Sequence, residues 1–287
     1  MKLMAGQPVK GIDHAVVVVR DIDAARDAWA RLGFQVQPRG FHMRLGTANH
    51  LMIFADNYVE LIGIVEANPF NAERRIWLED GGGLANAALR TDGAALAHAA
   101  WTEAGLEPDP VLEFDRAVQI GGREERAAFR TVRLGRRRAK LLGFFACEHL
   151  TPRFVYRQEW ARHPNSVVAL AGATVIADDP ATDETYVRKV FGDAAVRRKD
   201  GELLVVSGGT PIRYMTRERF LSMYPGITPN RSGDHPALLS FRVADLERAQ
   251  GTLARAGVMP ATASDGRVLI PPAFAAGVCV EFTKGQR

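Results

Sequence analysis

One short pattern recurs four times along the chain and limits the folds that it can adopt. Each copy reads as an apolar strand, an aspartate in a polar turn, a helix of about a dozen residues and a glycine. The strands are expected at 12–19, 84–89, 167–176 and 237–243, and the four aspartate-to-glycine spans run over 21–33, 92–105, 178–192 and 245–257. The copies begin about 70 to 85 residues apart, which is typical of a duplicated supersecondary unit and not of a solenoid. The chain is therefore expected to contain four similar modules, with any active site where modules face each other.

The first copy indicates how a module continues after its helix. Asp21 is placed to cap the N-terminus of that helix, and Gly33 to close its C-terminus. Three more strands are expected at 34–38, 50–55 and 58–65, the last two joined by a tight turn at Asp56 and Asn57. The second copy continues in the same way, with strands at 111–114, 125–134 and 141–147. The module is therefore β-α-β-β-β, and the predicted fold class is α+β.

Residues 149–165 interrupt the repeat. This stretch has two prolines, three aromatic residues and no clear period, so we interpret it as an ordered linker that packs against a surface. The expected units are then residues 1–148 and 166–287, each with two modules. The segment 216–236 also breaks the pattern and is expected to hold a short helix around 217–223.

Composition excludes several functional classes. The 287 residues are 47% hydrophobic and 24% charged, with a net charge of +4, which is ordinary for a globular protein. The dense basic run Arg136–Arg138 with Lys140 lacks aromatic stacking residues, so a solvated hairpin tip is favoured over nucleic-acid binding. No apolar run approaches the roughly 18 residues of a membrane span, and no signal segment is evident. Cys147 and Cys279 are too few for a disulfide framework, so buried, inert thiols and a cytoplasmic location are expected.

Two residues inside otherwise apolar strands point to chemistry. His14 shares one strand face with Val16 and Val18, and Glu60 shares a face with Tyr58 and Ile62. A buried carboxylate must be paired, protonated or bound to metal, because burying it alone costs several kcal/mol. An imidazole and a carboxylate suit a divalent ion such as Zn, Mn, Fe or Ni. A metal site and a structural hydrogen-bonded pair both remain open interpretations.

Three further histidines are candidates for the same site. His50 is the candidate for an additional metal ligand, while His42 and His149 are candidates for proton transfer, since a neutral imidazole can move a proton near pH 7. Asn49 and Tyr58 are expected in a substrate pocket, although Asn49 also suits a turn. Each histidine alone is more often a surface or capping residue than a metal ligand or catalytic base.

Several short segments together resemble the vicinal oxygen chelate superfamily, which includes glyoxalase I, extradiol dioxygenases, fosfomycin-resistance enzymes and methylmalonyl-CoA epimerase. The closer resemblance is to glyoxalase-like domain proteins. Besides Asp21, the segments are Gly-Ile-Asp-His at 11–14, Leu-Gly-Phe at 32–34, Arg-Gly-Phe-His at 39–42, Gly-Thr-Ala-Asn-His at 46–50, Tyr-Val-Glu-Leu-Ile at 58–62, His-Leu-Thr-Pro at 149–152, His-Pro-Asn at 163–165 and Gly-Val-Cys-Val-Glu-Phe at 277–282.

This resemblance implies four βαβββ modules paired into two half-barrel units. It also implies that His14 and Glu60 stand where these enzymes place metal ligands in the first and fourth strands of a module. The positions matching His14 in the other modules are Ala85, Ala171 or Gly172, and Leu238, none of which can bind metal. Glu281 has no matching histidine, so the second half is expected to hold no metal.

Three functions remain open from the sequence. The first is a metalloenzyme that acts on a small oxygen-bearing substrate, with lyase, isomerase or dioxygenase chemistry. The second is a non-catalytic protein that binds or sequesters a small molecule in the same cup. The third is a structural dimer whose cups are filled with side chains. The expected ligand is a small molecule, and a homodimer is compatible with the pattern.

Overall fold

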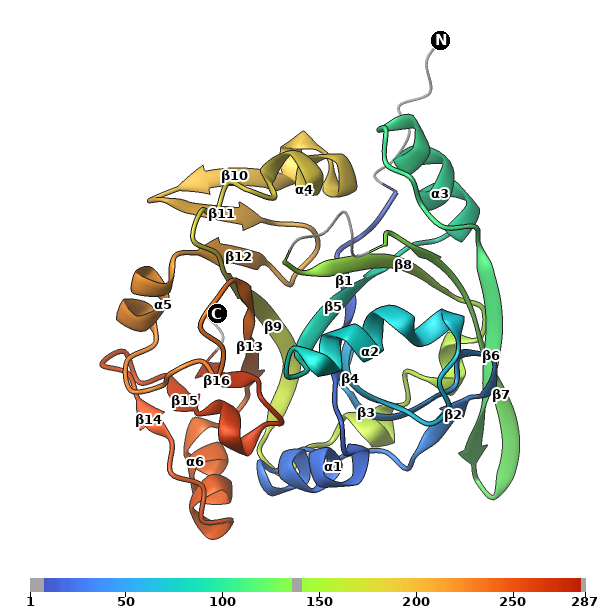
Figure 1. Cartoon of the computed structure of the whole chain (residues 1–287). Helices are drawn as coiled ribbons and strands as arrows, with labels where there is room; N and C mark the ends of the chain where they lie inside the picture. The colour runs from blue at the N-terminus through green and yellow to red at the C-terminus, as the bar shows by residue number, and fades with distance from the viewer. Residues whose placement is uncertain (1–7, 136–140, 285–287) are drawn as a thin grey trace.

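The computed structural model describes residues 8–135 and 141–284, which form two eight-stranded sheets (Figure 1). The strand orders are β2-β3-β4-β1-β5-β8-β7-β6 and β10-β11-β12-β9-β13-β16-β15-β14. In every module the first strand runs parallel to the fourth. The two modules of a sheet join through antiparallel pairs of their first strands, β1 with β5 and β9 with β13. The predicted α+β fold of four βαβββ modules in two half-barrel units is confirmed.

The strands of the first sheet carry the cup described below. They are β1 (Ile12–Val18), β2 (Gly40–His42), β3 (Thr47–Ile53), β4 (Tyr58–Ile64), β5 (Gly83–Arg90), β6 (Leu112–Ile120), β7 (Arg123–Arg133) and β8 (Gly143–His149). The second sheet consists of β9 (Val167–Ile176), β10 (Val196–Lys199), β11 (Glu202–Val205), β12 (Ile212–Met215), β13 (His235–Val243), β14 (Ala261–Thr262), β15 (Val268–Ile270) and β16 (Cys279–Lys284).

Four helices follow the first strands of the modules, and two more lie between modules. The four are α1 (Ile22–Arg31), α3 (Ala94–Glu103), α4 (Glu184–Phe191) and α6 (Leu246–Arg255). As predicted, the Asp21 carboxylate caps α1 by accepting from the backbone N–H groups of Asp23 and Ala24. The additional helices are α5 (Arg217–Met223), which lies at the predicted position, and α2 (Ala72–Glu79), which the sequence pattern did not predict.

Two strands differ from the sequence-based expectation. The strand expected at 34–38 is wrong, because residues 35–39 have no regular structure and β2 begins at Gly40. Pro38 has no N–H to donate to a neighbouring strand, so a ladder cannot continue through it. The strand expected at 111–114 runs on to Ile120 and pairs with β7 along its whole length. This longer hairpin brings β6 beside β2, so the first sheet curls toward a barrel (Figure 1).

One apolar core joins the two sheets. Trp29 on α1 is fully buried, with its ring centroid 5.2 Å from that of Phe34 and 6.0 Å from that of Phe241 on β13. Trp101 on α3 donates its indole N–H to the Val190 carbonyl of α4 at 3.1 Å. Helix α1 therefore packs against the second sheet and α3 against its helix α4, and the concave faces of both sheets point away from this core.

The two concave faces differ in their contents. In the second sheet, Phe220 and Tyr224, which lie on and just after α5, fill the face together with Met215, Leu238 and Leu269. In the first sheet, α2 lies across the concave side (Figure 1) and leaves a cavity beneath it. The third function considered above, with filled cups, thus describes the second sheet but not the first.

Part of the segment 149–165 packs against the first sheet. It forms short 3-10 turns at Pro152–Phe154 and Gln158–Ala161, and Val155 and Tyr156 join an apolar cluster with Leu51 and Tyr58.

Other sequence-based expectations have different outcomes. The basic run Arg136–Arg138 with Lys140 lies outside the described residues. Cys147 and Cys279 are both buried and free. Within the described residues, no helix is long and apolar enough to cross a membrane.

Replacing Trp29 with alanine is expected to destabilise both sheets together. The substitution leaves a large void in the shared core, and such changes cost about 3–5 kcal/mol. Urea denaturation followed by circular dichroism should show one transition at a lower midpoint. Leu96→Ala is a matched control, since Leu96 on α3 is 69% exposed. A second transition that retains half of the signal would show that the sheets unfold independently.

Candidate active site

The cavity in the first cup is small and mostly apolar. It measures ≈ 70 Å³, on a scale where one water occupies about 10–15 Å³. Aromatic side chains form much of its wall: Tyr58, Trp77, Phe114, Phe129 and Phe145. The polar groups that reach it from β1 to β4 are His14, His42, Asn49 and Glu60. An apolar pocket with a few convergent polar groups is the usual form of a small-molecule site.

A bulge in β1 places two polar side chains together. The pairing with β5 shifts between Ile12, opposite Leu89, and His14, opposite Ala88, so Asp13 is an extra residue in the strand. Such a residue interrupts the normal alternation of side chains. Asp13 and His14 are thus able to meet, with His14 Nδ1 2.8 Å from Asp13 Oδ1.

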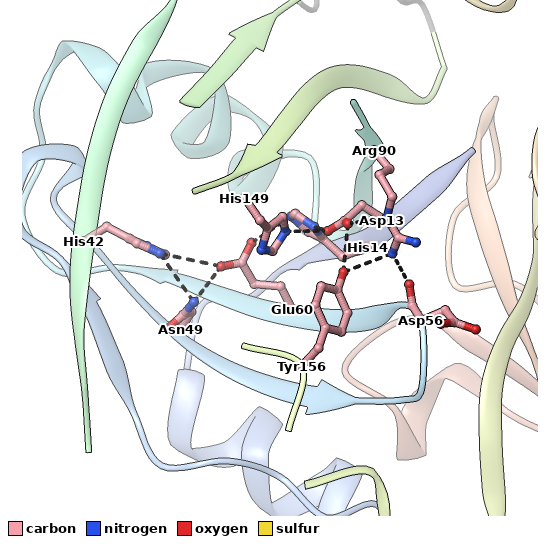
Figure 2. A network of polar contacts seen from close by, with 9 residues as sticks. All are labelled: Asp13, His14, His42, Asn49, Asp56, Glu60, Arg90, His149 and Tyr156. Atoms are coloured by element: carbon pink, nitrogen blue, oxygen red, sulfur yellow. Dashed lines mark hydrogen bonds and ion pairs between the residues drawn. The ribbon is translucent and has the colours of Figure 1, made fainter. Parts of the chain in front are cut away.

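The Asp13 carboxylate is fully buried and accepts hydrogen bonds from several elements (Figure 2). Oδ1 also accepts from His149 Nε2 of β8 at 2.9 Å, and Oδ2 accepts from the Tyr156 hydroxyl at 2.7 Å and from Arg90 Nε of β5 at 3.1 Å. Burial alone would raise the pKa of Asp13. The hydrogen bonds from His14 and His149 outweigh this effect and hold the pKa well below its usual range. Asp13 is therefore an anion at neutral pH, and His14 must donate Nδ1–H to it.

Glu60 lies on the other side of His14 (Figure 2). Its Oε1 accepts from Asn49 Nδ2 at 2.7 Å, and its Oε2 is 3.8 Å from His14 Nε2. Burial raises the pKa of Glu60, but the nearby His42 and His14 imidazoles and the Asn49 hydrogen bond lower it to below its usual value. The cavity floor therefore carries a buried carboxylate facing a histidine whose orientation is fixed.

His42 is a neutral base at physiological pH. Burial lowers its pKa to about 4. Asn49 Nδ2 lies 3.4 Å from His42 Nε2, which must accept, so Nδ1–H donates to the Thr47 hydroxyl at 3.1 Å. His42 Nε2 also lies 3.9 Å from Glu60 Oε1.

The arrangement of His14 and Glu60 suits one divalent ion. Their facing atoms are 3.8 Å apart, which two metal–ligand bonds of about 2.0–2.2 Å can span. The Asp13 hydrogen bond fixes His14 so that Nε2 points into the cavity, a common device for metal-binding histidines.

Asp13, His14 and His149 also place three ligand atoms within 4.8 Å of one another. That group fits a metal less well, because the Arg90 guanidinium lies 3.1 Å from Asp13 and would repel a cation. We therefore assign Asp13 to orienting His14, and not to binding the ion directly.

Comparison with known proteins agrees with this architecture. A family model described as a glyoxalase-like domain matches residues 12–190. The chain belongs to the glyoxalase-like domain family. The resemblance to the vicinal oxygen chelate superfamily is thereby confirmed. No curated protein matches the sequence.

Solved structures share the fold of this glyoxalase-like protein at low sequence identity. A hypothetical protein from Staphylococcus aureus is 12% identical, with a TM-score of 0.68 over 96% of this chain and 99% of that chain. A mutant of 4-hydroxymandelate synthase from Streptomyces coelicolor is 13% identical, with a TM-score of 0.56 over 96% and 92%. A xylose isomerase-like TIM barrel/4-hydroxyphenylpyruvate dioxygenase fusion protein is 16% identical, with a TM-score of 0.55 over 96% of this chain and 50% of that chain. These similarities show the fold alone.

The glyoxalase-like cup brings together most of the residues singled out from the sequence. His14, His42, Asn49, Tyr58 and Glu60 all line the cavity. The Tyr58 ring stacks on the His14 imidazole with centroids 4.2 Å apart. His149 does not line the cavity. It donates to Asp13 Oδ1, the same oxygen that accepts from His14, and so helps to position His14 indirectly.

The structure opposes the assignment of His50 as a metal ligand. His50 lies on the face of β3 opposite Asn49 and Leu51, and its Nδ1 donates to the Gln37 carbonyl at 2.8 Å. The strand alternation alone could have separated His50 from Asn49.

Sequence reasoning missed several residues of the site, including Asp13, Arg74, Arg90, Arg116 and Tyr156. Asp13 stands in the quoted motif at 11–14, but strict alternation places it on the opposite face from His14. Only the bulge reverses this. Arg74 lies on the unpredicted helix α2, and Arg116 lies on the part of β6 beyond the expected strand.

Glu281 of the second sheet has a different environment from Glu60. Its carboxylate accepts from the Ser240 hydroxyl and pairs with Arg267 Nη1 at 2.5 Å. A paired carboxylate beneath the apolar filling of the second cup suits a structural role.

Replacing Asp13 with asparagine is expected to cost about 1.5–3 kcal/mol of stability at pH 7, because it removes a buried carboxylate that accepts four hydrogen bonds, one of them from the partly exposed Arg90. The folded pKa of Asp13 lies below the unfolded value of about 3.9. The carboxylate therefore stabilises the fold above that pH, and its contribution declines as the pH falls below it. Urea titrations at pH 7, 5 and 3 should show the gap between the wild type and Asp13→Asn narrowing at pH 3. A constant gap contradicts this assignment.

His42 predicts a second pH dependence. Its folded pKa of about 4 lies below the ordinary value of 6.5, so the unfolded chain binds the proton more tightly. The neutral imidazole stabilises the fold above pH 6.5, and about 3 kcal/mol of this is lost between pH 6.5 and pH 4. The stability difference between the wild type and His42→Gln, measured by urea denaturation, should fall over this range. No change would mean that His42 titrates normally.

Proposed function

We propose that this protein is a metal-dependent enzyme that acts on a small oxygen-bearing substrate by proton transfer, as a lyase or isomerase. The observation that carries the proposal is the pair formed by His14 Nε2 and Glu60 Oε2, 3.8 Å apart at the floor of a small buried cavity. His14 and Glu60 would hold the ion. When bound, a divalent metal polarises substrate oxygens and stabilises the negative charge that develops on them.

The protein's own residues support proton transfer. His42 is neutral at pH 7, and its Nε2 lone pair accepts a long hydrogen bond from Asn49, so it can take a proton from a substrate that displaces that bond. Asn49 holds Glu60 in place and keeps the His42 tautomer fixed. The aromatic wall limits water around the substrate, which strengthens electrostatic interactions in the site.

A dioxygenase reaction has less support. Iron oxygenases commonly use two histidines and one carboxylate on one face of the ion. His14, His42 and Glu60 supply those residue types, but within the described residues they do not form a group with all ligand atoms within 4.8 Å. His42 is accordingly assigned to proton transfer, and a variant can separate the two roles.

A binding or sequestration protein is the second candidate. The observation that favours it is that, among the described residues lining the cavity, β5 and β8 present no histidine or carboxylate opposite His14 and Glu60. Their lining residues include Ala85, Phe145 and the Cys147 thiol. Such a protein would retain the ion and the small molecule without turning it over. Product formation from a bound ligand distinguishes the two functions.

Metal content tests the site directly. Protein purified without chelator and measured by mass spectrometry should contain close to one divalent ion per chain. His14→Ala and Glu60→Gln should each lower that content at least tenfold, since each removes one of two protein ligands. His50→Ala is a matched control, because His50 is buried in the same sheet but on its other face. His42→Gln should retain metal and lose activity.

Each outcome has a defined meaning. Equal metal loss in His50→Ala and His14→Ala, with both proteins folded, contradicts the assigned ligands. Metal loss in His42→Gln would show that His42 is a metal ligand and would favour the dioxygenase reaction over proton transfer. A wild-type protein that binds no divalent ion after incubation with Zn, Mn, Fe and Ni overturns the metalloenzyme proposal.

A further inference from the structure

The side chain of Arg116 is buried without a hydrogen bond or ion pair among the described residues. It lies on β6, is only 6% exposed, and lines the cavity together with Phe114, two residues earlier on the same strand face. Within residues 8–135 and 141–284 its guanidinium forms no hydrogen bond or ion pair, although it interacts with Tyr58 and Glu60 at longer range. An arginine that is nine-tenths buried is normally paired, because leaving its charge unpaired is costly.

Arg74 on α2 is a second cavity arginine with an unpaired buried donor. It also lines the cavity, and its Nε is buried with no hydrogen-bond partner. Other arginines in this region are satisfied: Arg90 pairs with Asp13, and Arg133 pairs with Glu73. Two cations from different elements therefore reach the cavity with bonding capacity unused.

The charges around the cavity favour an anion. Asp13 is balanced by Arg90, and Glu73 by Arg133. Glu60 alone remains to offset both Arg74 and Arg116, so the cavity carries an excess of one positive charge. A divalent ion on His14 and Glu60 would add to this excess.

Arg116 also stands at an entrance. It lines a groove of ≈ 680 Å³ between β2 and β6 as well as the cavity, and Leu51 and Phe114 likewise line both. Gly40 of β2 makes room there, because a Cβ at Gly40 would lie 3.1 Å from Arg116 Nη1 and 2.5 Å from Asn49 Oδ1. The guanidinium is thus accessible from the groove and from the cavity.

We propose that the cup binds a small organic carboxylate, with its carboxylate on Arg116, assisted by Arg74, and its apolar body against the aromatic wall. A planar guanidinium matches a carboxylate through two parallel hydrogen bonds. This assignment deepens the proposed function by naming the substrate class. It rests on that function only in placing the reacting end of the substrate toward His14 and Glu60. The apolar wall and the small cavity favour a carboxylate over a phosphate.

Calorimetric titration of chelator-treated protein tests the carboxylate site without the metal. The probes are benzoate and propionate, each against its neutral amide, with phenyl phosphate as the alternative anion. Both carboxylates should bind, and benzoate more tightly than propionate, because its ring buries more apolar surface. Each amide should bind at least tenfold more weakly than its acid, since hydrogen bonds to charged groups contribute more than neutral ones.

Variants of the arginines complete the test. Arg116→Gln should weaken benzoate binding at least tenfold, and Arg116→Lys should fall between the wild type and Arg116→Gln. Arg74→Gln should have a smaller effect. Arg130→Gln is the control, since Arg130 is an exposed cation on the neighbouring strand β7 that lines neither the cavity nor the groove.

Thermal unfolding gives a readout that does not depend on the ligand. Removing an unpaired buried charge should stabilise the free protein, so Arg116→Met is expected to raise Tm by about 2–4 °C while abolishing benzoate binding. A lower Tm would show that Arg116 is a structural residue and would overturn the proposal.

The binding outcomes are equally decisive. Equal affinity for benzoate and benzamide, or unchanged benzoate affinity in folded Arg116→Gln, overturns the carboxylate site. Tighter binding of phenyl phosphate than of benzoate assigns the site to phosphate esters and also overturns it. If the protein holds no metal but these titrations succeed, the proposed function fails and the carboxylate site stands.

Discussion

The buried Asp13 carboxylate is the interaction on which the rest of the site depends. It accepts from His14 on β1, His149 on β8, Arg90 on β5 and Tyr156 of the segment after β8. These donors come from both modules of the first sheet, so one anion fixes their relative positions. Because a buried carboxylate is tolerated only when its oxygens are satisfied, the strands and the segment after them must assemble together. The orientation of His14 toward Glu60 follows from this network.

The first cup separates its charges into two groups with different roles. Asp13 and Arg90 balance each other behind His14, and their hydrogen bonds are used within the protein. Glu60, Arg74 and Arg116 face the cavity. Glu60 has an amide partner, Arg74 Nε is buried without a partner, and Arg116 forms no ion pair among the described residues. A fold normally pairs such groups internally, so unpaired cations in a buried cavity are typical of sites where stability is given up for binding.

The two sheets show how similar modules diverge after duplication. Glu60 and Glu281 both lie on the last strand of a module beneath a concave face. Glu281 pairs with Arg267 under a cup filled by Phe220 and Tyr224, whereas Glu60 faces His14 under an open one. The inserted helices account for the difference, because α5 places aromatic side chains into the second cup while α2 lies across the first and leaves space beneath it.

The sequence by itself determined the modular fold and much of the site. Repeated strand–helix–glycine patterns require similar local structures, and strand alternation placed His14 with Val18, and Glu60 with Tyr58. It could not place Asp13, because a bulge reverses alternation and depends on the pairing of β1 with β5. It likewise could not place Arg116 or Arg74, which reach the cavity only because β6 curls toward β2 and α2 crosses the cup. Local periodicity fixes which face of a strand a residue occupies, whereas tertiary packing decides which faces meet and which charges are left without a partner.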